Sequence, residues 1–88
     1  MSDLGELGSA FRAAIQKIEE AQSSASLTRD RGDDALRLVS SVSDGSSNVL
    51  VQGAIERVAA ADAALEEVLG MYVAAAEALH IYLGRQGL

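Results

Sequence analysis

Cysteine, proline and tryptophan are all absent from this chain of 88 residues, and aromatic residues make up only 3% of it. Without cysteine, the chain has no disulfide, thiolate metal site or cysteine nucleophile, and its redox compartment cannot be inferred. Without proline, the strongest helix breaker is missing, so long helices are permitted. Few aromatic residues also mean little buried apolar area per residue. We therefore expect one narrow domain at most.

Basic residues are also scarce, since seven Lys and Arg stand against thirteen Asp and Glu and give a net charge of −6. This charge repels phosphate backbones and anionic membrane surfaces, so we expect no nucleic-acid partner and no membrane insertion. The opening residues, MSDLGELGSA, contain acids and glycines where a signal peptide has a basic and then an apolar segment. We therefore expect a cytoplasmic protein. Export by a route that needs no cleavable signal peptide stays an alternative.

Each half of the chain carries a stripe of apolar or small residues in alternating steps of three and four. In the first half the stripe consists of Leu4, Leu7, Phe11, Ala14, Ile18, Ala21, Ala25, Thr28, Gly32, Ala35, Val39 and Val42. In the second half it consists of Val51, Ala54, Val58, Ala61, Leu65, Val68, Tyr72, Ala75, Leu79 and Tyr82. This spacing is helical, whereas the strand period of two fails in both halves, so the sequence predicts an all-α fold.

The segment between the two stripes has the composition of a turn. Gly45 can adopt a left-handed capping conformation, and Ser46, Ser47 or Asn48 can cap the helix that follows. We predict a single antiparallel helical hairpin over residues 1–88, with helices at about 3–43 and 49–84, a turn at about 44–48, and arms of roughly 60 Å.

Helix periodicity does not determine the register of the two helices or the continuity of the first one. Complementary sizes favour pairing positions whose residue numbers add to about 93, which places Phe11 near Tyr82 at the open end. Residues 23–34 are rich in serine and include Thr28 and Gly32, which lower helix propensity. A kink or a break in the first helix is therefore left open.

Both stripes are widened on one flank by further apolar residues, which gives the broad face of a helix bundle. Because a lone hairpin cannot cover this face, we predict a four-helix bundle formed as a dimer with the same chain or a homologous hairpin. The predicted partner interface consists of Ile15, Leu36, Ile55, Leu69, Leu83, Tyr72 and Tyr82. The two tyrosines can alternatively be core residues whose hydroxyl groups reach the rim.

The sharpest candidate for chemistry is the E-x-x-H pair of Glu77 and His80, a spacing that binds metal in carboxylate-bridged helical bundles. The stripe passes through Ala75 and Leu79, which puts Glu77 on the outward face, and the chain has no second histidine. We therefore predict no catalytic, metal or cofactor site and no small-molecule substrate. The favoured interpretation is a non-enzymatic interaction module, with a metal-binding ferritin-like assembly or a coiled-coil scaffold subunit as alternatives.

An acidic, cysteine-free chain of this length, built as two long helices about a central turn with Gly45, resembles the small WXG-type proteins of type VII secretion systems. The resemblance covers the whole chain and implies a secreted partner, chaperone or adaptor that pairs into a four-helix bundle. The family's turn tryptophan is absent, and its C-terminal tyrosine–acid motif is replaced by Tyr72 with Ala76 and Tyr82 with Gln86. Six arginines against one lysine also resemble the composition of alanine-rich segments from actinobacterial secretion loci.

Overall fold

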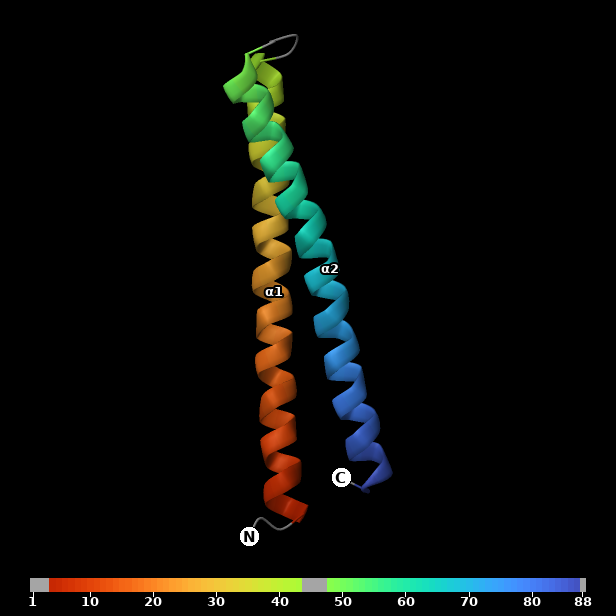
Figure 1. The fold of residues 1–88 in the computed structure, drawn as a ribbon. Helices are drawn as coiled ribbons and strands as arrows, with labels where there is room; N and C mark the ends of the chain where they lie inside the picture. The colour runs from red at the N-terminus through yellow and green to blue at the C-terminus, as the bar shows by residue number, and fades with distance from the viewer. Residues whose placement is uncertain (1–3, 44–47, 88) are drawn as a thin grey trace.

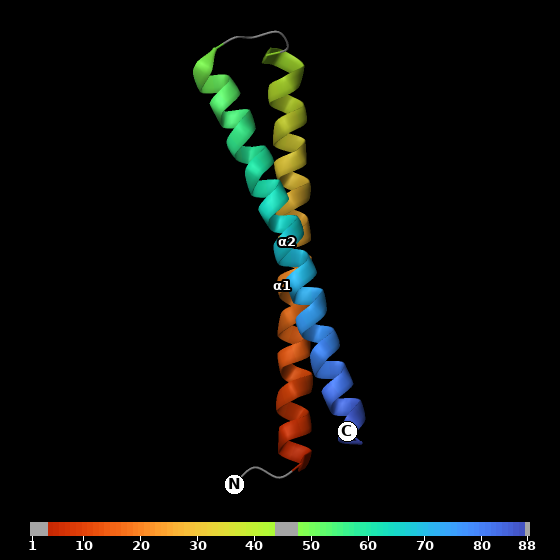
Figure 2. The same ribbon diagram turned by 45° about the vertical axis from the view of Figure 1, so that its right-hand side comes forward.

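The protein is an antiparallel pair of long helices, as the sequence predicts (Figure 1). The computed structural model describes residues 4–43 and 48–87. Helix α1 spans Leu4–Ser43 and helix α2 spans Val49–Arg85, and the two helices contact each other along their length. Helix α2 crosses α1 at a shallow angle, so the ribbons overlap near the turn in Figure 1 and near their middle in Figure 2.

The molecule is a rod, with extents of 62 × 19 × 14 Å and a radius of gyration of 19.5 Å. A compact domain of 88 residues has a radius of gyration of about 12 Å. The long axis agrees with the arm length expected from the helical rise. A hairpin of this shape has only one layer of side chains between its helices, so each helix keeps most of its circumference exposed.

Helix α2 begins at a side-chain cap. Asn48 has an extended backbone, and its Oδ1 accepts hydrogen bonds from the backbone N–H groups of Leu50 at 2.9 Å and Val51 at 3.3 Å. These two bonds satisfy donors that have no partner inside the helix. Asn48 is one of the three capping residues predicted from the sequence, while the capping role predicted for Gly45 falls outside the described residues.

Helix α1 runs without interruption through residues 23–34, so the structure shows no break there. Local contacts bind this serine-rich segment to the helix. The Thr28 hydroxyl donates to the Ser24 carbonyl at 2.9 Å, and the Arg29 guanidinium contacts Ser26 and Asp30. The low helix propensity of these residues is therefore overcome by continuity with the helical turns on either side and by packing against α2.

The contact between the helices follows a heptad spacing, and we call it the seam. All of its residues are buried or half-buried, and it includes every described side chain that is buried. In α1 the seam consists of Gly8, Phe11, Ile15, Ile18, Gln22, Ala25, Arg29, Gly32, Leu36 and Val39. In α2 it consists of Val51, Ile55, Val58, Asp62, Leu65, Leu69, Tyr72, Ala76, Leu79 and Leu83.

Half of the sequence stripe lies in this seam, and the other half is displaced from it by one residue. The stripe passes through Ala14 and Ala75, for example, where the seam passes through Ile15 and Ala76. Each helix is therefore turned by about 50° from the orientation predicted, half the angle between successive residues. The displaced residues form a second row beside the seam, which we call the outer row. It consists of Leu7, Ala14, Ala21, Thr28, Ala35 and Val42 in α1, and Ala54, Ala61, Val68, Ala75 and Tyr82 in α2.

The rotation has a physical reason in the sizes of the side chains. Turning each helix toward the seam buries isoleucines and leucines, whereas the predicted orientation buries mainly alanines at the same levels. An isoleucine or leucine removes far more apolar area from water than an alanine does. This gain is accompanied by the inclusion of three polar residues in the seam, Gln22, Arg29 and Asp62.

Candidate partner-binding surface

Six of the seven residues predicted to face a partner lie in the seam between the two helices of the chain. Ile15 and Leu83 are only 4% and 5% exposed within the single hairpin, so they have no free surface for a second chain. Their assignment to a partner interface is corrected, because the opposite helix of the same chain already covers them. Leu36, Ile55 and Leu69 are half-buried in the seam, and a partner contact at these three positions stays a prediction.

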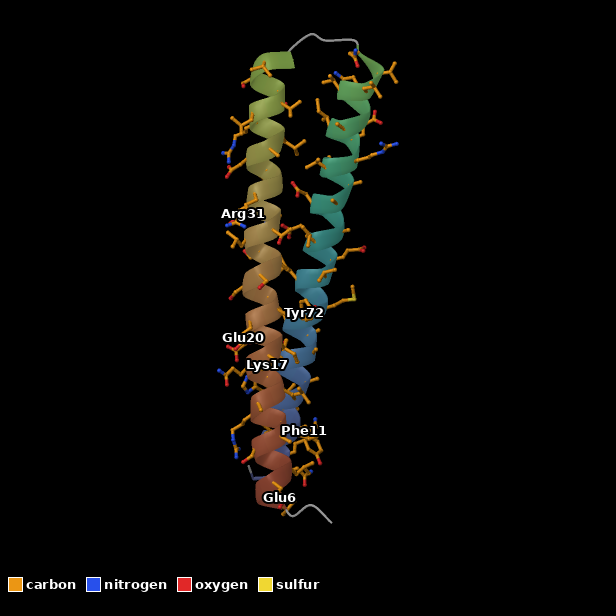
Figure 3. All side chains as sticks on the ribbon, turned by 90° about the vertical axis from the view of Figure 1, so that its left-hand side faces the viewer. Glu6, Phe11, Lys17, Glu20, Arg31 and Tyr72 are labelled. Atoms are coloured by element: carbon orange, nitrogen blue, oxygen red, sulfur yellow. The ribbon has the colours of Figure 1, made fainter. Side chains whose placement is uncertain are left out.

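The two tyrosines occupy different environments. Tyr72 is half-buried in the seam, and Figure 3 shows it between the helices. Tyr82 belongs to the outer row and is 38% exposed. Its ring packs edge-on against Phe11, with the ring centroids 5.2 Å apart. This contact confirms the register expected from the sequence at the open end, and it leaves part of the Tyr82 ring available to a partner.

Charged residues of α1 lie mainly away from α2. In Figure 3 the labelled Lys17, Glu20 and Arg31 lie on the side of α1 opposite to α2, whereas Phe11 lies toward it. Lys17 pairs with Glu20 one helical turn away, at 3.3 Å, and both side chains are exposed. An exposed pair of this kind adds little to stability and mainly keeps this side of the rod solvated.

A polar cluster interrupts the seam near its centre. Arg29 bonds the Glu66 carboxylate across the two helices, at 2.5 Å, and Asp62 lies against α1 where Gly32 stands. A Cβ atom at position 32 would overlap the Asp62 carboxylate, so the absence of a side chain there makes room for it. Gly32 therefore lets a carboxylate enter a helix interface that is otherwise mainly apolar.

The carboxyl group of Asp62 is incompletely satisfied. Its Oδ2 atom is buried and has no hydrogen-bond partner among the described residues. A hydrogen bond with the Asp33 carboxyl group raises the pKa of Asp62, and desolvation and the Asp33 charge raise it further. Arg29 acts in the opposite direction, although its own pKa is raised by its hydrogen bond to Glu66. The centre of the seam therefore holds a carboxyl group that releases its proton less readily than a free aspartic acid does.

Glu77 and His80 lie beside a shallow open groove between the helices. The groove is lined by both residues together with Glu19, Gln22 and Val73, among others. Within residues 4–43 and 48–87, no group of three or more His, Cys, Asp or Glu side chains is placed to hold a metal ion. The arrangement thus provides two side chains of the E-x-x-H pair on an exposed edge, without the converging carboxylates of a bundle metal site.

Comparison of the chain with protein-family models, curated proteins and solved structures gives no match. In the part of the chain that the structure describes, neither helix has an apolar stretch long enough to cross a membrane. The basis for assigning a function is therefore the geometry of the hairpin itself.

Sequence reasoning missed the two charged seam residues, Arg29 and Asp62, because it favoured a stripe free of charge. The signal that identifies the true seam is the phase of the large aliphatic residues. Ile55, Leu69 and Leu83 recur at intervals of fourteen, and Ile15 and Leu36 differ by twenty-one, so within each helix all lie at one heptad position. Giving this phase more weight than the avoidance of charge predicts the observed orientation.

Proposed function

We propose that the protein is a non-enzymatic interaction module whose hairpin is completed by a second helical hairpin in a four-helix bundle. The observation that carries this proposal is the exposed area. The single chain exposes 6285 Å², whereas a compact protein of its mass, 9.1 kDa, exposes about 4,900 Å². The excess of about 1,400 Å² is larger than the roughly 800 Å² that each partner contributes to a standard protein interface.

The interior of the single hairpin supports the same proposal. Among the described residues no side chain is less than 2% exposed, and the buried apolar residues are Ile15, Ala25, Ala76 and Leu83. Two alanines and two larger side chains make a small core for two helices of 40 and 37 residues. Long helices gain most of their stability from tertiary packing, so a partner helix pair would supply what this hairpin lacks.

A role as secreted partner, chaperone or adaptor of a type VII secretion system is the biological form of this proposal. It is supported by the hairpin architecture, the chain length and the acidic composition. We propose it as the setting in which the bundle forms, with the partner chemistry defined below.

The proposal is tested by sedimentation equilibrium of the purified wild-type chain. The concentrations run from about 1 to about 100 μM, a range in which micromolar dissociation constants are measured. We expect a mass of twice 9.1 kDa through most of this range, with high helicity by circular dichroism. A stably folded, helical chain that keeps the mass of one copy at every concentration, and that recovers no partner when isolated from its cells, would overturn the proposal.

A further inference from the structure

The outer row is the most uniformly uncharged surface of the hairpin. Ten of its eleven residues are apolar, the eleventh is Thr28, and none is charged, although 23% of the chain is charged. The seam itself tolerates Arg29 and Asp62, so charge is excluded more strictly from the outer row than from the contact between the helices. A surface that stays exposed in the working protein has no need of this restriction.

Both parts of the outer row lie on the same face of the hairpin. An antiparallel helix pair is related by an approximate two-fold axis perpendicular to the plane of its helices, so equivalent flanks of the two helices share one face. The contact between Phe11 of the seam and Tyr82 of the outer row lies on this side. The Arg29–Glu66 pair and the groove containing Glu19, Val73 and His80 mark the opposite edge. The outer row is therefore one apolar face that follows both helices.

The hairpin leaves this face only partly covered. Leu7, Ala14, Ala21 and Val68 are half-buried by the neighbouring helix, so they have already lost part of their hydration. The remaining residues are exposed, and Val42 near the turn is 86% exposed. The face is thus continuous with the seam, and a second layer of helices placed on it would extend the existing core rather than start a separate one.

We propose that the outer row is the surface on which a second copy of this chain packs, face to face, to form the bundle. This inference rests on the proposed function and names its partner and contact residues. Two copies meeting through this face would bury none of the charges that give each chain its net charge of −6. The face serves both partners, as a closed two-fold dimer requires.

The area and the side chains of the outer row agree with this partner. If each copy removes its excess of about 1,400 Å², the dimer buries about 2,800 Å², which lies in the range of obligate homodimers. Seven of the eleven positions are alanine or threonine, namely Ala14, Ala21, Thr28, Ala35, Ala54, Ala61 and Ala75. Small side chains let helices approach closely, while Leu7, Val42, Val68 and Tyr82 supply the larger contacts.

Two matched double variants test the surface. Ala61→Glu with Ala75→Glu places carboxylates in the outer row, and Ala60→Glu with Ala74→Glu places them one residue away on the same helix. All four alanines are exposed in the single hairpin, so both variants add the same charge at similar cost to the helix. We expect the outer-row variant to raise the dimer dissociation constant by at least about 100-fold, because dimerisation would bury its carboxylates. The control variant should dimerise within about threefold of wild type.

The outcomes separate this inference from the proposed function. A wild type that stays monomeric would overturn this inference, and it would overturn the proposed function as well only if no partner chain is recovered with the protein. A dimeric wild type with equal affinities for the two variants would overturn the assigned face while leaving the interaction module intact. If only the Ala60→Glu/Ala74→Glu variant loses dimer affinity, the contact lies on the outward face of α2, around Met71 and Gly70. This result would also overturn the assigned face. Ala75→Gln, which adds no charge, provides a milder variant if the carboxylates unfold the hairpin, and it should still weaken the dimer more than Ala74→Gln does.

Discussion

The half of the hairpin near its open end and the half near its turn are packed differently. The open-end half, residues 4–25 and 69–87, contains all of the buried residues among those described, including Ile15, Ala76 and Leu83. The turn half, residues 26–42 and 48–68, contains none. The same heptad spacing runs through both halves, so spacing alone does not determine how well a helix interface is buried.

The difference follows from the side chains at seam positions. Toward the open end the seam has Phe11 and Ile15 in α1 and Leu83 in α2, and the Phe11 ring also meets Tyr82. Toward the turn the seam contains Arg29, Gly32 and Asp62, which bring charge or no side chain at all. The open end therefore supplies most of the apolar stabilisation, and the polar cluster near the centre supplies contacts that depend on register and protonation.

The largest predicted difference between the two halves concerns a pair of isoleucines at the same heptad position. Ile15→Ala removes a side chain that is 4% exposed and should lower the free energy of unfolding by about 3 kcal/mol. Ile55→Ala removes the same atoms from a half-buried site and should cost about 1 kcal/mol. Urea denaturation at one fixed protein concentration measures both values, since dimerisation makes stability depend on concentration.

Equal losses for the two isoleucine variants would contradict the contrast between the halves. A loss at Ile55 that exceeds the loss at Ile15 would show that the turn half becomes the better-buried half in the assembled protein. Repeating the comparison at two concentrations distinguishes these contributions, because only the part due to the dimer changes with concentration.

A smaller effect is expected from neutralising the carboxyl group in the seam. Asp62→Asn removes the negative charge and keeps the shape of the side chain. In the wild type, the buried Oδ2 atom of Asp62 has no hydrogen-bond partner among the described residues. The groups that face it are Asp33 and Arg29 on α1, with Glu66 on its own helix. At neutral pH we expect the variant to have the higher denaturation midpoint, because the wild-type carboxylate is desolvated and repelled by Asp33.

The pH dependence gives the sign of this effect. Because the pKa of Asp62 is raised in the folded state, its contribution to stability is complete below its unfolded value of about 3.9. This contribution is lost as the pH rises through the raised pKa. The midpoint difference between Asp62→Asn and wild type should therefore grow as the pH is raised from below 4 to neutral. A difference that is constant with pH, or that shrinks as the pH rises, would contradict the assignment.

The helices and their antiparallel register follow from the sequence because each depends on features that do not require packing detail. The lack of proline and the sustained helical period predict two long helices. The structure then identifies Asn48, one of three capping residues that the sequence offers, as the start of the second helix. The ring contact of Phe11 and Tyr82 shows the register that complementary sizes predict. Local propensity alone allows a break in residues 23–34, whereas tertiary contact with α2 favours the continuous helix.

The faces of the helices are harder to predict because two neighbouring stripes are both apolar. One stripe includes Ile15 and Leu83 together with Asp62, and the other has alanines but no charge. Periodicity cannot choose between rows that differ by one residue, since both have the heptad spacing. The choice depends on whether burying large aliphatic side chains outweighs admitting a carboxylate, and here Gly32 lowers that cost by making room for Asp62.

Thiol labelling tests most directly the central claim that a second copy covers the outer row. Since the chain has no cysteine, Ala61→Cys in the outer row and Ala60→Cys beside it each provide a single reactive group at an alanine that is exposed in the hairpin. At concentrations where the protein is dimeric, we expect iodoacetamide to react with the residue-61 thiol at least about tenfold more slowly than with the residue-60 thiol, because burial protects a thiol. On dilution the two rates should converge. Equal rates at every concentration, in protein that remains dimeric, would contradict the claim.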